Sequence, residues 1–152
     1  MDPKIAAGCG CLLGMAAGDA MGNTVDKLTW DEICENYGPN GLLGYDLSND
    51  DAQITSYTQL AAFTCNGLLL GLTRGQMLGK MAPLVRYVDL AHREWAASQR
   101  PWGRPARSYC WLLRKRELCQ RHCMDTRMLD TQKKKKIGSL EDPVNNYSTP
   151  CS

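Results

Sequence analysis

The sequence predicts an all-α protein, and three observations support this fold class. Apolar residues recur at positions i, i+3 and i+4 over long stretches, which is the spacing of one helix face. Residues that cap helices precede several of these stretches. Glycines recur every fourth residue near the N-terminus. With 152 residues, of which 43% are hydrophobic, the chain has the length of one globular domain.

The first predicted helix runs from about Pro3 to Gly22. Its glycines form one stripe along the helix, because residues four apart lie on the same face; they are Gly10, Gly14, Gly18 and Gly22. Each interior glycine costs a helix about 1 kcal/mol relative to alanine. We therefore expect a neighbouring backbone to pack closely against this stripe, which would make the helix buried and central.

Two more helices follow. Thr29 and Glu32 form a capping-box pattern, which predicts a short helix over residues 30–37. The sequence Gly-Pro-Asn-Gly at 38–41 predicts a turn, and 42–49 a loop or short extended piece. A longer helix is expected from about Thr55, with a buried side made of Leu60, Ala61, Phe63, Thr64, Leu68 and Leu69.

The second half of the chain is predicted to be helical over 74–99, with a break or new start at Pro83. A helix face is expected there from Leu84, Tyr87, Val88, Ala91 and Trp95. Pro101 and Pro105 bracket a turn before a basic helix over about 106–124. We therefore divide the chain into a helical domain, 1–124, and a loop-rich, partly disordered tail, 125–152.

Charge is distributed unevenly along the chain. Residues 93–136 carry thirteen Lys or Arg and four Asp or Glu, whereas residues 1–92 carry five and ten, respectively. Aromatic side chains interleave with the basic ones, which is typical of a surface that contacts phosphates and stacks on bases. This candidate ligand or partner surface comprises Arg100, Trp102, Arg104, Arg107, Tyr109, Trp111, Arg114, Lys115, Arg116 and Arg121. A solvated helix face followed by a lysine-rich loop explains the same pattern without a ligand.

The cysteines and histidines give no clear catalytic pattern. The eight cysteines lack the spacing of a disulfide framework, so we expect reduced thiols in a cytoplasmic protein. Cys119, His122 and Cys123 would share a helix face, but without a Cys-x-x-Cys pair they are a weak zinc candidate. The two histidines have no nucleophile at motif spacing. Residues 5–22 contain Asp19 and five glycines, which makes them a poor membrane span.

Three motifs follow one another along the chain, at residues 10–22, 37–46 and 54–61. Together they resemble the ADP-ribosylglycohydrolase (dinitrogenase-reductase-activating glycohydrolase) family. Residues 10–22, GCLLGMAAGDAMG, are similar to its opening helix, G-x-L-x-G-x-A-x-G-D-A-x-G. Residues 37–46, YGPNGLLGYD, resemble its Y-G-P-x-G loop. Residues 54–61, ITSYTQLA, align with its T-D-D-T-x-M/L helix start. A weaker fourth similarity covers 137–146. The resemblance spans about half of a typical family member and implies the compact, orthogonal helical bundle of the family's N-terminal half.

The resemblance also implies a metal site that this sequence has altered. Family members use two Mg²⁺ ions to hydrolyse the bond between ADP-ribose and a modified side chain, and magnesium prefers carboxylate oxygens. Thr55 matches the motif, but Ser56 and Tyr57 stand at its two carboxylate positions. Asp50 and Asp51 are the nearest candidates to compensate, although turn or cap roles suit them better. For Asp19 we expect a structural role, accepting hydrogen bonds from a neighbouring helix start.

These observations favour a catalytically degenerate glycohydrolase-like protein that acts by binding a protein partner and holds no metal or other cofactor. One concrete form of this role is an inhibitor, encoded by a phage or mobile element, of a host defence effector. The alternatives are an ADP-ribose reader, magnesium-dependent hydrolysis retained with a complementing chain, and nucleic-acid binding through 93–136. A homodimer is a further prediction, because half of a family fold would expose apolar helix faces. No membrane association is expected.

Overall fold

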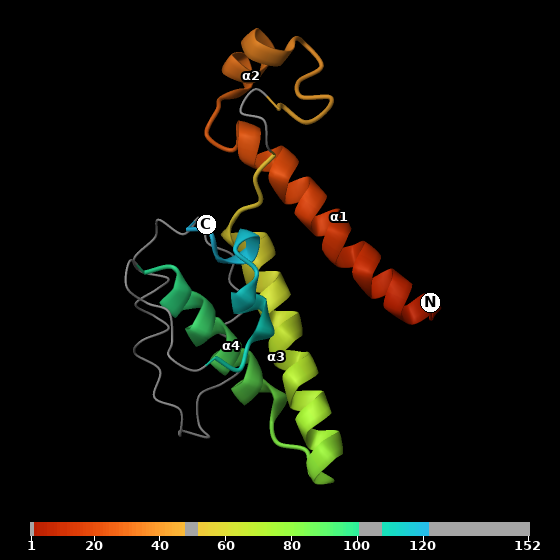
Figure 1. Cartoon of the computed structure of the whole chain (residues 1–152). Coiled ribbons are helices and arrows are strands. Elements are labelled where there is room, and N and C mark those ends of the chain that lie inside the picture. Colours follow the sequence, from red (N-terminus) through yellow and green to blue (C-terminus); the bar gives the residue numbers. More distant parts are fainter. Residues whose placement is uncertain (1, 48–51, 101–107, 122–152) are drawn as a thin grey trace.

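The computed structural model describes residues 2–47, 52–100 and 108–121, and every regular element in these ranges is helical. Four α-helices, α1 (Pro3–Val25), α2 (Trp30–Tyr37), α3 (Ser56–Leu78) and α4 (Leu84–Ser98), are followed by two short 3₁₀ helices, η1 (Trp111–Arg114) and η2 (Glu117–Cys119). The prediction of an all-α fold is therefore confirmed (Figure 1). The expected tail, 125–152, and the turn between Pro101 and Pro105 lie outside the described residues.

The helices begin and end where the local sequence predicts. The capping box of α2 is formed, because Thr29 accepts from the Glu32 backbone while Glu32 accepts from the Thr29 N–H at 2.7 Å. The turn after α2 has positive φ at Gly38 and Gly41, a conformation that favours glycine. Helix α3 ends at Gly79, which is also left-handed, and α4 starts after Pro83. Residues 74–78 thus belong to α3, and the predicted break is real.

The hydrophobic core lies between α3 and α4. Phe63, Ala91 and Trp95 are fully buried there, and η1 adds Leu112. The Trp95 indole N–H donates to Gln59 Oε1 at 2.9 Å, so the buried ring has its polar atom satisfied. The predicted face of α4 is confirmed, and so is the burial of Phe63, but Leu69 is exposed. The prediction that Leu69 is buried is wrong, because α4 packs against a neighbouring face of α3.

Glycines set the close approach of α3 and α4. A Cβ on Gly67 would lie 2.7 Å from the Tyr87 carbonyl oxygen and 2.8 Å from the Val88 Cα. Gly71 and Gly75 lie one and two turns further along. A Cβ on either would be too close to a side chain, that of Tyr87 or of Met81. The four-residue glycine stripe that lets backbones approach is therefore on α3.

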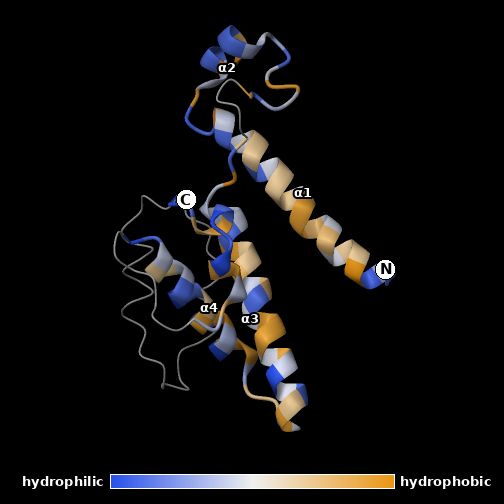
Figure 2. Ribbon diagram, in the orientation of Figure 1, coloured by the Kyte–Doolittle hydropathy of each residue, from blue (hydrophilic) through white to orange (hydrophobic). Residues whose placement is uncertain are grey.

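The expected close packing against α1 is wrong for the described residues. A Cβ at Gly10, Gly14, Gly18 or Gly22 would meet nothing within 4 Å. Near its C-terminal end α1 meets the start of α3 through hydrogen bonds of Asp19, and Ala20 is its one buried residue. Apolar residues make up most of α1 (Figure 2), and its N-terminal part stands away from the α3–α4 pair (Figure 1).

The sequence stretch expected to be a poor membrane span lies within α1, and by length and composition this helix is long and apolar enough to cross a membrane. It is the single such helix among the described residues. Length and composition alone are weak grounds, since buried helices and signal sequences share them.

The basic segment does not form the expected long helix over 106–124. Its described part, 108–121, contains the short helices η1 and η2, which contribute Leu112 to the core and pack Leu118 and Cys119 against it. Glu94, which is buried, accepts from the backbone N–H groups of Tyr109 and Cys110 at 2.9 Å each. Gln59 Nε2 donates to the Gln120 carbonyl at 2.9 Å. These tertiary hydrogen bonds hold an irregular backbone path in place of a continuous helix.

Candidate functional site

The candidate site is the N-terminus of α3, where the sequence places an altered metal-binding motif. Thr55 is the N-cap, and its hydroxyl accepts from the Tyr57 N–H at 3.2 Å. Ser56 and Tyr57 occupy the first two helical positions. The Tyr57 side chain is exposed, whereas Ser56 is half-buried. The helix start therefore presents a hydroxyl and a phenol to its surroundings.

The Asp19 carboxylate of α1 accepts hydrogen bonds from this helix start. Its carboxylate accepts from the Thr55 N–H at 2.7 Å, from the Thr55 hydroxyl at 2.6 Å and from the Thr58 hydroxyl at 2.5 Å. Burial alone would raise the pKa of Asp19, but the hydrogen bonds from Thr55 and Thr58 together hold it below its usual value of 3.8. The predicted structural role of Asp19 is thus confirmed. The part played by Thr58, a buried threonine, was not predicted.

This arrangement predicts a pH-dependent link between α1 and α3. Because the folded pKa of Asp19 is lowered, its ionised form stabilises the fold above about pH 4, and this contribution is lost as pH falls through the folded pKa. An Asp19→Asn variant should therefore be less stable than wild type at neutral pH, and the gap should narrow in acid. Urea unfolding at several pH values measures this gap. Asp26→Asn, an exposed change at the end of the same helix, is the control; a gap of equal size in that variant would contradict the assignment.

The side chains at the α3 start do not fit two magnesium ions. Magnesium requires oxygen ligands in near-octahedral geometry and is bound through carboxylates. Among the residues that the structure describes, the carboxylate at this helix start is Asp19, which already accepts three hydrogen bonds. Within the described ranges no group of three or more His, Cys, Asp or Glu side chains could hold a metal. Asp50 and Asp51, the predicted compensating residues, lie outside the described residues.

The basic surface is partly described. Seven of its ten predicted residues lie in the described ranges, and Trp102, Arg104 and Arg107 do not. Six of the seven are exposed, namely Tyr109, Trp111, Arg114, Lys115, Arg116 and Arg121, while Arg100 is half-buried. The six exposed side chains, four basic and two aromatic, belong to one segment, 108–121.

The cysteines and His92 show no catalytic arrangement. The six cysteines in the described ranges are free thiols. Burial, followed by the neighbouring Glu94 carboxylate, raises the pKa of Cys110 to about 12, so this thiol is not a nucleophile. His92 Nε2 lies 2.7 Å from the Thr64 hydroxyl between α3 and α4, and burial lowers its pKa. In the weak zinc candidate, His122 and Cys123 lie outside the described residues.

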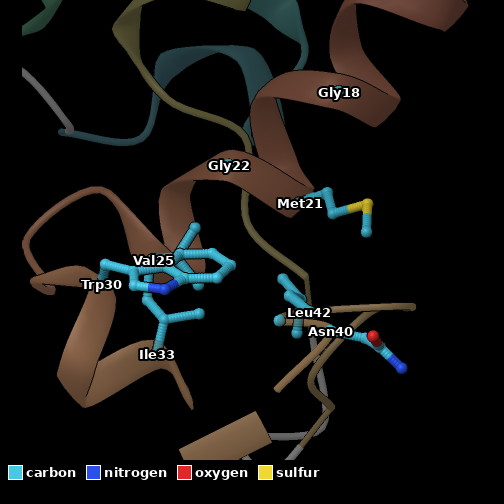
Figure 3. A pocket seen from close by; sticks show the side chains of 9 residues that line it. Gly18, Met21, Gly22, Val25, Trp30, Ile33, Asn40 and Leu42 are labelled. Atoms are coloured by element: carbon cyan, nitrogen blue, oxygen red, sulfur yellow. The ribbon is translucent and has the colours of Figure 1, made fainter. Parts of the chain in front are cut away.

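A second feature, not predicted from the sequence, is an open hollow of about 440 Å³ beside α2 (Figure 3). Its apolar wall comes from the end of α1, from α2 and from the loop after it, through Met21, Val25, Trp30, Ile33 and Leu42. The capping box of α2 and the tight turn at 38–41 together bring these segments to one place. The signal in the sequence was the pair of apolar residues Trp30 and Ile33, three apart on a helix with three acidic residues.

Comparison with known proteins agrees with the motifs. The family model for ADP-ribosylglycohydrolase matches residues 3–140, which is most of the chain. No curated protein and no solved structure gives a significant match. The matched range includes the glycine-rich opening helix, the Asp19–Thr55 contact and the α3 start. The chain therefore belongs to the ADP-ribosylglycohydrolase family.

Proposed function

We propose that this chain is a non-catalytic member of its family that acts as a protein-binding module. The observation that carries the proposal is the α3 start, where Ser56 and Tyr57 replace the carboxylates that the family motif supplies. The serine hydroxyl and the tyrosine phenol are not carboxylates, so they do not supply the carboxylate oxygens that would offset the dehydration of two divalent cations.

The remaining carboxylate supports this proposal. The Asp19 carboxylate accepts hydrogen bonds from Thr55 and Thr58, and these bonds hold α1 against the start of α3. Asp19 thus links α1 to α3 in the part of the chain that the structure describes. The scaffold can thus retain its helix arrangement without a metal.

A protein partner is supported by the exposed apolar side chains. Large apolar residues are more than half exposed on several elements, among them Ile5, Leu13, Trp30, Leu43, Leu69 and Met77. Soluble monomers rarely leave extended apolar surface uncovered, so a protein surface is the occupant we propose. An inhibitor that covers part of another protein, such as a host defence effector, is one specific form of this role.

Replacing the two altered residues by carboxylates tests the loss of the metal site. The Ser56→Asp/Tyr57→Asp variant should fold, because Asp is favourable in the first turn of a helix. We expect millimolar MgCl₂ to raise the thermal unfolding temperature of this variant relative to NaCl of equal ionic strength. Wild type and the neutral Ser56→Asn/Tyr57→Asn control should show no such rise. A rise in wild type as large as in the Asp variant would contradict the proposal.

A further inference from the structure

The hollow beside α2 has the features of a binding site for an aromatic side chain. Its volume of about 440 Å³ lies within the range of about 300–1,000 Å³ that is usual for ligand sites. Figure 3 shows Trp30, Val25 and Ile33 on one side of it and Leu42 and Asn40 on the other. Trp30, although it lines the hollow, is 62% exposed. An indole face is thus available to an incoming ring.

The segment around the hollow is strongly acidic. Residues 19–46 contain six acidic residues and one lysine, a net charge of −5. Asp26, Asp31 and Glu35 are exposed on or next to the helices that line the hollow. Helix α2 has eight residues and is therefore about 12 Å long. This length is close to the Debye length of about 8–10 Å in physiological salt. The acidic side chains on and next to α2 therefore attract positive charge on a group that binds in the hollow. The occupant should be aromatic or apolar and flanked by positive charge.

The chain itself carries a surface of this kind. Residues 108–121 hold four basic residues and one acidic residue, a net charge of +3. Tyr109 and Trp111 in the same segment are 59% and 53% exposed. The hydrogen bonds from this segment to Glu94 and Gln59 fix its backbone, so little order must be gained on binding. In Figure 1 this cyan segment lies beside α3 and α4, apart from the α2 end that forms the hollow.

We propose that the hollow of one copy receives Trp111 of a second copy, with Arg114, Lys115 and Arg116 facing the acidic segment around the hollow. The two exposed indoles, Trp30 and Trp111, can then stack, and a neighbouring guanidinium can lie over a ring. The contact is heterologous, because each copy uses a different surface. Such a contact leaves one hollow and one Trp111 free at the two ends of a pair, so larger assemblies form as concentration rises.

Sedimentation velocity over a range of concentrations tests this inference. We expect wild type to form dimers and larger species that dissociate as salt is raised. Gly22→Leu should weaken assembly about tenfold or more, because Gly22 lines the hollow and the added side chain enters it. The matched control is Gly10→Leu, on the same helix in equally open space but away from the hollow; it should assemble as wild type does. Trp111→Ala should weaken assembly as Gly22→Leu does.

Mixing the two deficient variants gives the most specific result. Gly22→Leu keeps its Trp111, and Trp111→Ala keeps its hollow, so an equimolar mixture should form a 1:1 dimer that grows no further. A monomer at every concentration would overturn the inference, as would a mixture that stays monomeric. If wild type stays monomeric and its Trp111 surface binds single-stranded DNA, the surface serves nucleic acid and the inference also fails. The inference rests on the proposed protein-binding role alone, so magnesium binding and assembly can fail separately.

Discussion

Replacing Trp95 by alanine should destabilise the fold more than any other single truncation considered for this chain. Trp95 is fully buried among Phe63, Ala91 and Leu112, and its indole N–H donates to Gln59. Removing a large buried aromatic side chain costs about 3–5 kcal/mol, through lost burial and the cavity left behind. Gln59 Oε1 would also lose its closest donor. The measurement is the free energy of unfolding from urea denaturation followed by circular dichroism.

Two further variants keep this prediction testable. Trp95→Phe retains most of the packing and loses the hydrogen bond, so it should lie between wild type and Trp95→Ala. Trp111→Ala removes the same side chain from an exposed position and should change the free energy of unfolding by less than about 0.5 kcal/mol. Equal losses for Trp95→Ala and Trp111→Ala would show that the α3–α4 core is not the main source of stability.

Adding one methyl group to Gly67 should also destabilise the fold. Its Cβ would lie 2.7 Å from the Tyr87 carbonyl oxygen and 2.8 Å from the Val88 Cα, which is backbone that no rotamer change can move. The two helices must separate, and overpacking of this kind costs about 1–3 kcal/mol. We expect Gly67→Ala to lower the free energy of unfolding by an amount in this range, measured in the same way.

Gly14→Ala is the matched control, because Gly14 is also a helical glycine but has nothing within 4 Å of the added methyl. Alanine there should leave stability unchanged or raise it by up to about 1 kcal/mol, through its higher helix propensity. The two substitutions should thus act in opposite directions. If Gly67→Ala stabilises the protein as Gly14→Ala does, the close crossing of α3 and α4 is wrong.

Local signals in the sequence predicted much of the fold. Helix ends depend on contacts within a few residues, so the Thr29–Glu32 capping box, the turn at 38–41 and the start at Pro83 could all be read directly. Asp19 was also assigned correctly, since a carboxylate on an apolar helix needs donors and a helix start supplies them.

Which helices and segments pack against one another was not predicted. A stripe of glycines indicates that another backbone can pack closely, but it does not indicate which segment supplies that backbone. The stripe of α1 was therefore given a role that Gly67, Gly71 and Gly75 of α3 play. Similarly, a basic, helix-compatible sequence at 106–124 gave no sign that Glu94 and Gln59 would hold residues 108–121 in another conformation. The hollow was not predicted for the same reason, because three segments must pack together to form it.

The most direct test of the proposed loss of catalysis is a calorimetric titration of the wild-type chain with ADP-ribose, with and without magnesium. Ser56 and Tyr57 at the α3 start, together with an Asp19 that is engaged by Thr55 and Thr58, predict no magnesium-dependent heat of binding. Magnesium-dependent binding of ADP-ribose would contradict this proposal and would show that other residues of the chain supply the metal ligands.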